Sequence, residues 1–210
     1  MDDVRAAIAW VRDRHPERAA GRHLRYDPPM DRVLNAKLTY DDYAAVPADG
    51  MTYQIIDGEV FVTPAPSPFH QRASKRLQRL LEAFFEDTGR GEVFNAPIDL
   101  ILSPHDILQP DLVVVTDPSI VSGRGIEAPP LIVVEVLSPS SIKHDRQVKA
   151  RRYALLGVAH YWIVDPDARR LECFSLVDGA YRATAAAEAP AKVEVPGFVG
   201  LTIDLGAIFK

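Results

Sequence analysis

The distribution of apolar residues along the chain predicts two short buried β-strands near its middle. Residues 112–115 read Leu-Val-Val-Val, and residues 131–137 read Leu-Ile-Val-Val-Glu-Val-Leu. Both runs are short, rich in β-branched residues and bounded by Pro, Gly or Ser, which is typical of strands buried on both faces. Asp111 opens the first strand and Glu135 lies within the second. A carboxylate in such a strand is costly to bury unless a cation or a hydrogen-bond donor holds it.

Turn and cap signals predict the elements on either side of these strands. The pair Asp57-Gly58 between apolar runs predicts a β-hairpin over residues 52–63. Ser67 followed by Pro68 predicts the start of a helix that runs to about Thr88, before Gly89. Its buried stripe is expected to consist of Ala73, Leu77, Leu80, Leu81 and Phe84.

The remaining pattern completes an α/β (α+β) chain. Thr39 is expected to cap a short helix, with Asp42 supporting its first turn. Further strands are expected over about 93–101, 161–164 and 193–195, helices over 144–156 and 203–209, and a terminal hairpin at Asp178-Gly179. Helical spacing of Val4, Ile8 and Val11 predicts a loosely packed helix in an N-terminal extension, residues 1–36. Residues 37–210 are then one domain, a sheet with helices on its faces.

Composition narrows the functional classes. With 210 residues and 47% hydrophobic content, the chain can build one sizeable core. Its net charge of −5 argues against a dedicated nucleic-acid coat protein but allows local basic patches beside an acidic site. The single Cys173 excludes an internal disulfide and multi-cysteine metal clusters. The acidic start, with no long apolar run after it, predicts no signal peptide and no membrane span, hence a cytoplasmic protein.

The two strand acids have the chemistry of a metal site. Strand alternation puts Asp111 on the face of Val113, and Glu135 on the face of Val133. If the strands are neighbours, the two carboxylates converge. Two hard oxygen donors, with a backbone carbonyl and waters, suit Mg²⁺ or Mn²⁺. Such an ion can activate a bound water and stabilise charge on a scissile phosphate.

Three further side chains are candidates for the same site, each with a simpler alternative. Glu59 heads a strand after the hairpin turn; it is either a third acid, acting directly or through water, or a surface acid. His70 extends the inward stripe of its helix, as a functional group or as a core histidine. Lys149 shares a helical face with Asp145 and Tyr153, where it would position water or remain a solvated charge. Gln109, just before Pro110-Asp111, could also touch the site.

The ordered motifs resemble one known family. They are Asp57-Gly58-Glu59, His70, Pro110-Asp111, the segment Glu135-Val136-Leu137-Ser138-Pro139-Ser140, the series Asp145, Lys149, Tyr153, and Tyr161-Trp162-Ile163-Val164-Asp165. This series, over about residues 39–209, resembles the Uma-type restriction endonucleases, bacterial proteins long classed as a domain of unknown function. They are similar to the PD-(D/E)XK nuclease superfamily.

The resemblance implies a restriction-endonuclease-like core, with a mixed central sheet flanked by helices, and Mg²⁺-dependent phosphodiester hydrolysis. Asp111 then matches the Asp of the motif, Glu135 its second acid and Glu59 the early glutamate. The motif lysine belongs two residues after the second acid, where this chain has Leu137. Lys149 of the next helix is therefore expected to reach the site in its place.

Three functions fit these observations. The first is an endonuclease that binds Mg²⁺ or Mn²⁺ and cuts DNA, with a homodimer as a reasonable way to cut two strands. The second is a catalytically inactive module that kept the fold and binds DNA or a regulatory partner; the third is a hydrolase acting on another phosphorylated substrate. Retention of all three acids and a lysine favours the first. Exposed cations could form a rim for the nucleic-acid backbone or be ordinary solvated helix faces: Arg72, Lys75, Arg76, Arg79 and the cluster at 143–152.

Overall fold

The structure is a computed structural model that describes residues 37–46, 52–63, 65–139 and 141–210. The expected helix of the N-terminal extension lies outside these residues. The short helix predicted at the start of the domain is confirmed. Thr39 caps helix α3 (Tyr40–Ala44) in a capping box with Asp42.

A mixed six-stranded sheet forms the centre of the molecule, as predicted. Its strand order is β10-β9-β8-β7-β6-β3, with β7 and β8 parallel and all other neighbours antiparallel. The strands are β3 (Glu92–Asn95), β6 (Leu112–Val115), β7 (Ile132–Val136), β8 (His160–Asp165), β9 (Arg170–Val177) and β10 (Ala180–Glu188). Strands β6 and β7 are buried at every position, as expected for apolar runs covered on both faces.

Two smaller antiparallel sheets accompany it. One has the order β2-β1-β5-β4, and β11 pairs with β12 in the other. Their strands are β1 (Thr52–Ile56), β2 (Glu59–Thr63), β4 (Leu100–Ser103), β5 (Asp106–Leu108), β11 (Lys192–Glu194) and β12 (Thr202–Asp204). The single strand predicted over 93–101 is wrong: it is split into β3 and β4, which belong to different sheets, around the cis bond Ala96-Pro97. Strands β5 and β12, of three residues each, were not predicted.

Both predicted hairpins are confirmed. At the tip of β1–β2, Asp57 and Gly58 have φ values of 53° and 82°. Two successive left-handed residues make the turn whose twist matches antiparallel strands, and Asp-Gly is a favoured pair for it. The turn of β9–β10 repeats this geometry at Asp178 and Gly179.

The helices begin where their caps predict. Helix α4 (Pro68–Phe85) starts after Ser67, whose hydroxyl accepts a hydrogen bond from the backbone N–H of His70 at 3.2 Å. The helix predicted over 144–156 consists of a π-helical segment η2 (His144–Lys149) followed by α5 (Ala150–Leu155). The chain ends in the short helix α6 (Leu205–Ile208), and η1 (Pro118–Ile120) is a 3₁₀ turn. No helix in the described part of the chain is long and apolar enough to cross a membrane.

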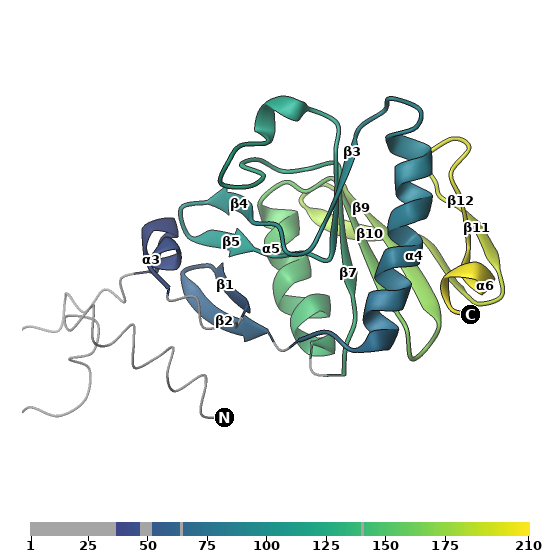
Figure 1. The fold of residues 1–210 in the computed structure, drawn as a ribbon, viewed down its shortest axis with the longest axis horizontal. Coiled ribbons are helices and arrows are strands. Elements are labelled where there is room, and N and C mark those ends of the chain that lie inside the picture. Colours follow the sequence, from purple (N-terminus) through teal and green to yellow (C-terminus); the bar gives the residue numbers. More distant parts are fainter. Residues whose placement is uncertain (1–36, 47–51, 64, 140) are drawn as a thin grey trace, which may run out of the picture.

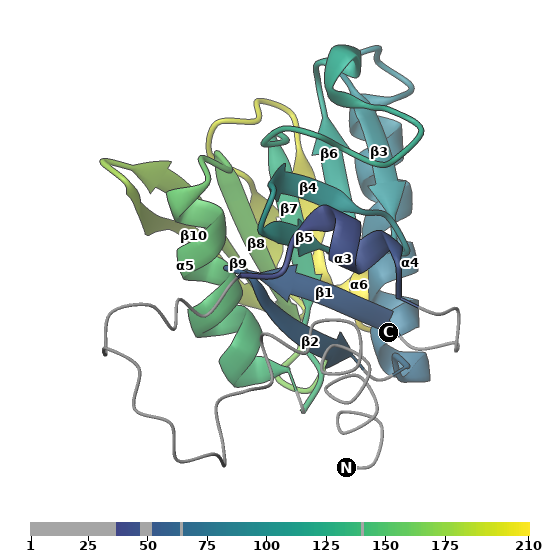
Figure 2. The same cartoon turned by 90° about the vertical axis from the view of Figure 1, so that its left-hand side faces the viewer.

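The large sheet separates two hydrophobic cores. On one face, α4, α6 and the β11–β12 pair cover a core that includes Leu77, Leu81 and Trp162. On the other face, α5 and the four-stranded sheet cover the second core, which includes Val113 and Val133 (Figure 1). The side view shows the four-stranded sheet β2-β1-β5-β4 and helix α5 side by side in front of the large sheet, with α4 behind the large sheet (Figure 2). Candidate site residues can therefore approach the ends of β6 and β7 from both layers.

Candidate active site

The register of the central strands makes Asp111 and Glu135 neighbours. Strand β6 pairs with β7 so that Leu112 faces Val134 and Val113 faces Val133. One step further along this ladder, Asp111 comes opposite Glu135. The predicted adjacency of the two strands is thus confirmed, and both acids lie at the end of the sheet near the start of α4 and η2.

Asp111 is held by the neighbouring strand β7 and by helix α4. Its Oδ2 accepts a hydrogen bond from the backbone N–H of Val136 at 2.7 Å, which ties the residue to the neighbouring strand. Nε2 of His70, on α4, lies 3.2 Å from the same oxygen. The Asp111 side chain retains 18% exposure, so the carboxylate remains in reach of a ligand from solvent.

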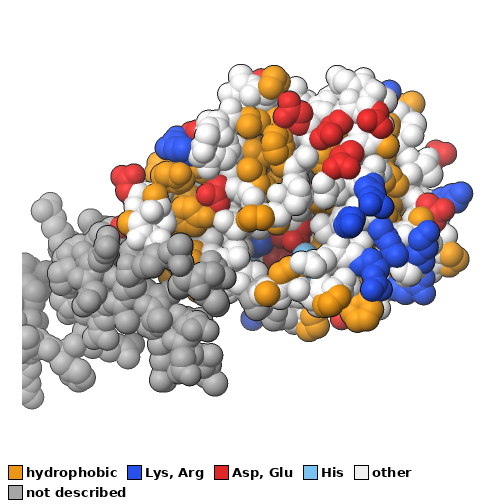
Figure 3. Space-filling model, viewed as in Figure 1, with side chains coloured by type: hydrophobic (Ala, Val, Ile, Leu, Met, Phe, Trp, Pro, Cys, Tyr) orange, Lys and Arg blue, Asp and Glu red, His pale blue; other side chains and the backbone are white. Residues whose placement is uncertain are grey.

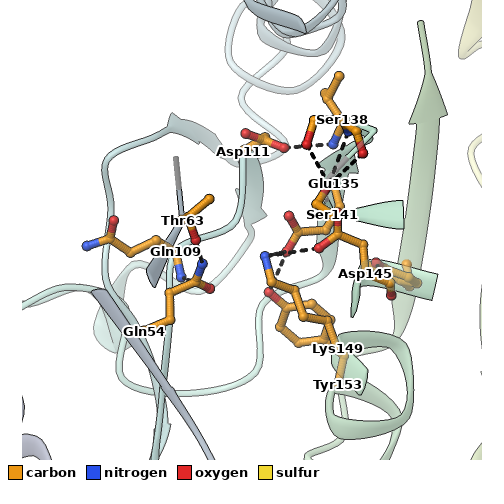
Figure 4. A network of polar contacts seen from close by, with 12 residues as sticks. Gln54, Thr63, Gln109, Asp111, Glu135, Ser138, Ser141, Asp145, Lys149 and Tyr153 are labelled. Carbon is orange, nitrogen blue, oxygen red and sulfur yellow. Dashed lines mark hydrogen bonds and ion pairs between the residues drawn. The ribbon is translucent and has the colours of Figure 1, made fainter. Parts of the chain in front are cut away.

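Glu135 is the centre of a buried polar cluster. Its Oε1 accepts hydrogen bonds from Nζ of Lys149 at 3.0 Å and from the hydroxyl of Tyr153 at 2.8 Å. The same ammonium lies 3.4 Å from Oδ1 of Asp145. These three charged side chains are 3–5% exposed. Figure 4 shows Lys149 and Tyr153 pointing from their helix toward Glu135, with Asp111 on the far side of that acid.

The π-helical turn explains how Lys149 reaches this position. The N–H of Ala150 bonds to the carbonyl of Asp145, five residues back, and Tyr161 donates a further hydrogen bond to that carbonyl at 3.0 Å. A π-turn adds a residue to the helical circuit, and such turns are frequent at functional sites. Lys149 thus comes from the element predicted to supply it, and Leu137 is a buried core residue.

Burial and neighbouring charges shift the pKa values of this cluster. Burial raises the pKa of Glu135 to about 8; Lys149 opposes the shift, while the charges of Asp145 and Asp111 add to it. Burial alone would lower the pKa of Lys149, but Glu135 and Asp145 outweigh it and raise that pKa, so the ammonium stays charged. Burial likewise opposes the charged form of His70, but its bond to Asp111 raises the pKa of the imidazole. One buried ammonium therefore serves several acids.

The structure does not bring Glu59 and Gln109 into the polar cluster. Glu59 is exposed at the start of β2, and within the described residues no hydrogen bond or ion pair involves its carboxylate. Strand alternation puts it on the side of Phe61, whose ring lies 4.5 Å from that of His144 in η2, so it faces the same layer. Its part in the site stays a prediction. The Gln109 side chain turns away and donates to Tyr43 and Asp99.

Two contributors were not assigned a role from the sequence. Tyr153 was predicted only to share a helical face with Lys149; its hydroxyl donates to Glu135, and burial raises its pKa well above the ordinary value, so it remains a donor. Gln54 is 2% exposed, and its side chain accepts a hydrogen bond from the backbone of Gln109, just before Pro110-Asp111 (Figure 4). The signal for Gln54 is present in the sequence: an amide inside the apolar strand Tyr53-Gln54-Ile55-Ile56 needs a partner.

The donor set suits a hard divalent cation. Within the described residues, no group of three or more His, Cys, Asp or Glu side chains is gathered closely enough to hold a metal ion by itself. Mg²⁺, however, needs only one or two carboxylates, because it keeps several of its waters. The hydrogen bonds and ion pairs described above use Oδ2 of Asp111 and Oε1 of Glu135. A divalent cation beside Glu135 would also offset the burial that disfavours the ionised form of this acid.

Comparison with known proteins assigns the chain to a family. A family profile described as "Uma2: Putative restriction endonuclease" matches residues 40–206, most of the chain. The chain belongs to the Uma2 family. A crystal structure titled as "a putative nuclease belonging to DUF820" from Anabaena variabilis is similar in fold, with a TM-score of 0.68 and 18% identity over 82% of this chain and 97% of that chain. No curated protein matches the chain.

The family and the fold confirm two expectations from the sequence. The resemblance to Uma-type endonucleases is borne out by the family match, and the mixed sheet flanked by helices is borne out by the structure and its similarity to the Anabaena protein. Together they indicate a restriction-endonuclease-like nuclease.

Proposed function

We propose that this Uma2 protein is a metal-dependent endonuclease that hydrolyses phosphodiester bonds in DNA, with Asp111 and Glu135 as ligands of Mg²⁺ or Mn²⁺. The observation that carries the proposal is the buried cluster at the ends of β6 and β7. Glu135 of β7 and Asp145 of η2 share the Lys149 ammonium there, beside Asp111 of the neighbouring strand, and the pKa of Glu135 is raised to about 8. Strongly shifted titration in a cluster of charged groups is typical of functional sites.

Each residue of the cluster has a role that follows from its contacts. Bound between Asp111 and Glu135, the ion would supply positive charge to the scissile phosphate and lower the pKa of a water. Lys149 places a fixed ammonium 3.0 Å from Glu135, where it can hold the attacking water and offset developing negative charge. His70 and the Val136 N–H orient Asp111, and Tyr153 orients Glu135. Glu59 is proposed to assist through water from the hairpin.

A substrate has a route to these residues. Asp111 and His70 form part of the lining of a surface groove with a volume of about 360 Å³. Figure 3 shows acidic side chains and a histidine at the bottom of a hollow, with Lys and Arg side chains gathered beside it over α4. A phosphodiester in the groove would therefore meet the acids at one end and cations along one wall.

A cleavage assay tests the proposal. Supercoiled and linear DNA are incubated with Mg²⁺ or Mn²⁺ and the wild type, Asp111→Asn, Glu135→Gln or Lys149→Ala. We expect metal-dependent cutting by the wild type and a loss of about 100-fold or more in each variant, as for removal of a group that stabilises transition-state charge. Glu59→Ala is expected to lose less, because its carboxylate lies outside the buried cluster.

Asp87→Asn, an exposed acid just beyond α4, is the matched control and should cut like the wild type. Circular dichroism of every variant separates lost chemistry from lost folding. Cutting that survives in Asp111→Asn would contradict the proposal. Metal-independent DNA binding by a wild type that never cuts would instead identify an inactive nuclease-fold module.

A further inference from the structure

The groove beside Asp111 has a lining that differs from the buried cluster. It runs between α4 and the segment that follows β3, and Asp111 and His70 lie at its site end. Its other polar walls are neutral or cationic: Gln71, Ser74, Lys75, Gln78 and Asn95. The four from α4 recur at helical spacing, so they line one helix face over about 10 Å.

Some of these groups are already engaged, and others are available to a ligand. The Gln78 amide donates to Glu82 at 2.7 Å and lies 3.5 Å from the side-chain oxygen of Asn95, which braces the far end of the groove. Gln71 and Lys75 are exposed. Among the described residues, no hydrogen bond or ion pair occupies their side chains. An amide and an ammonium therefore face the groove one helical turn apart, next to Asp111.

Such a lining matches the chemistry of a nucleic-acid strand. Lys makes a point-charge contact to phosphate, whereas Gln and Asn amides offer a donor and an acceptor to base edges or sugar hydroxyls. Residues 68–81 of α4 also carry Arg72, Lys75, Arg76 and Arg79 and no acid. Arg76 donates to the carbonyls of Ile208 and Lys210, and the other three cations give the helix a net positive charge toward the nucleic-acid backbone. This local charge is opposite to the net charge of −5 for the whole chain.

The geometry points to a strand-binding subsite: the groove holds the nucleotides next to the phosphate that is cleaved, with Lys75 on a phosphate and Gln71 on the adjoining base or sugar. This inference rests on the proposed function, because it takes Asp111 to mark the point of cleavage. It adds the residues that hold the strand, and it assigns α4 the role of positioning the substrate.

Binding without metal tests the subsite independently of cleavage. Fluorescein-labelled 20-mers of single-stranded DNA, duplex DNA and RNA are titrated in EDTA with the wild type, Lys75→Ala and Gln71→Ala, and anisotropy is recorded. We expect each variant to bind DNA about fivefold more weakly. For single strands, Lys75→Ala should also reduce the slope of log K against log salt by about 0.7, the loss of one phosphate contact. Lys192→Ala, an exposed lysine on β11, should change neither quantity.

A cross-linking experiment locates the strand. Cys173 is buried and burial raises its thiol pKa to about 12, so a new surface thiol is the reactive one. Gln71→Cys should form a disulfide with DNA that carries an activated disulfide tether on an internal base, and Lys192→Cys should not. Unchanged binding by both alanine variants together with no cross-link would overturn the inference.

The two proposals can fail separately. Groove-dependent binding and cross-linking by a wild type that does not cut with Mg²⁺ or Mn²⁺ would support the subsite and refute the nuclease. DNA cleavage by a protein whose DNA affinity does not change in the Lys75 and Gln71 variants would support the nuclease and refute the subsite. RNA that binds through the groove as tightly as DNA would support the subsite and change the substrate class.

Discussion

At the scale of single residues, the proposed active site depends most on the buried ion pair of Glu135 and Lys149. A buried ion pair is weak evidence for stability, since apolar residues of similar volume often serve as well. Here the Lys149 ammonium also pairs with Asp145. The pKa of Glu135 is raised to about 8 even though Lys149 acts to lower it. A strongly raised pKa beside a buried ammonium is typical of functional sites, and this is the physical reason why we propose a catalytic role for the pair.

A double-mutant cycle measures the coupling within this pair. Lys149→Met leaves buried acids without a cation, so we expect it to lower the free energy of unfolding by roughly 3–5 kcal/mol. Adding Glu135→Gln should recover part of that loss, because Gln is neutral in the unfolded chain as well, whereas Glu135, with its pKa raised to about 8, must take up a proton on folding at pH 7. Urea unfolding at pH 7 in EDTA gives the four values. Strict additivity of the two substitutions would show that the side chains do not interact.

At the scale of elements, a second ion-pair network joins the β1–β2 hairpin and β5 to α5. Asp106 on β5 is fully buried; its Oδ2 lies 2.7 Å from Nη2 of Arg152, and its Oδ1 accepts a hydrogen bond from the N–H of Asp57 at 2.9 Å. Arg152 also lies 3.0 Å from the Asp57 carboxylate at the hairpin tip. Since Lys149 precedes Arg152 by one helical turn, this network also fixes the helix that carries the site lysine.

The pKa of Asp106 predicts how stability depends on pH. Burial alone would raise this pKa, but hydrogen bonds from Arg152, Ser103 and the Asp57 N–H outweigh it and lower it below the ordinary value of 3.8. A lowered pKa contributes stability that is present above pH 3.8 and lost as the pH falls through the folded-state pKa. Asp106→Asn should therefore cost roughly 2–3 kcal/mol at pH 7.

The difference between wild type and Asp106→Asn should shrink below pH 3.8, where the wild type loses the same contribution. Chemical unfolding from pH 7 to pH 3 measures it, with the exposed Asp87→Asn as control. A difference that stays constant over this range would show that the charge of Asp106 is not what stabilises the junction.

At the scale of the whole molecule, charge is distributed unevenly. The chain has a net charge of −5, yet residues 68–81 of α4 carry four cations and no acid, and Lys and Arg side chains gather there beside the hollow that holds the acids (Figure 3). Local potential rather than net charge steers a polyanion to a site. A protein with an acidic overall composition can therefore still present a nucleic-acid surface.

Salt dependence tests this surface. Neutralising Arg72 and Arg79 to Gln should reduce the slope of log K against log salt for duplex DNA by about 1.8, since each phosphate contact contributes about 0.9. The matched control neutralises exposed Arg182 on β10 and Lys192 on β11, and should leave the slope unchanged. Equal effects of the two double variants would indicate nonspecific attraction instead of a surface centred on α4.

The sequence by itself determined the features that depend on a few neighbouring residues. The Asp57-Gly58 and Asp178-Gly179 turns, the Ser67 cap of α4 and the apolar runs of β6 and β7 carry their own local reasons to form. The order of motifs was also sufficient to recognise the family, which the match over residues 40–206 confirms.

Only the tertiary structure decided which groups meet. Local pattern could not show that residues 93–101 divide between two sheets, because strand pairing depends on distant partners. Nor could it show that Tyr153 binds Glu135, that Gln109 turns away, or that a π-turn carries Lys149 to the strand acids. Contacts of this kind are set by strand register and packing across the sheet, and such long-range geometry leaves little trace in any short stretch of sequence.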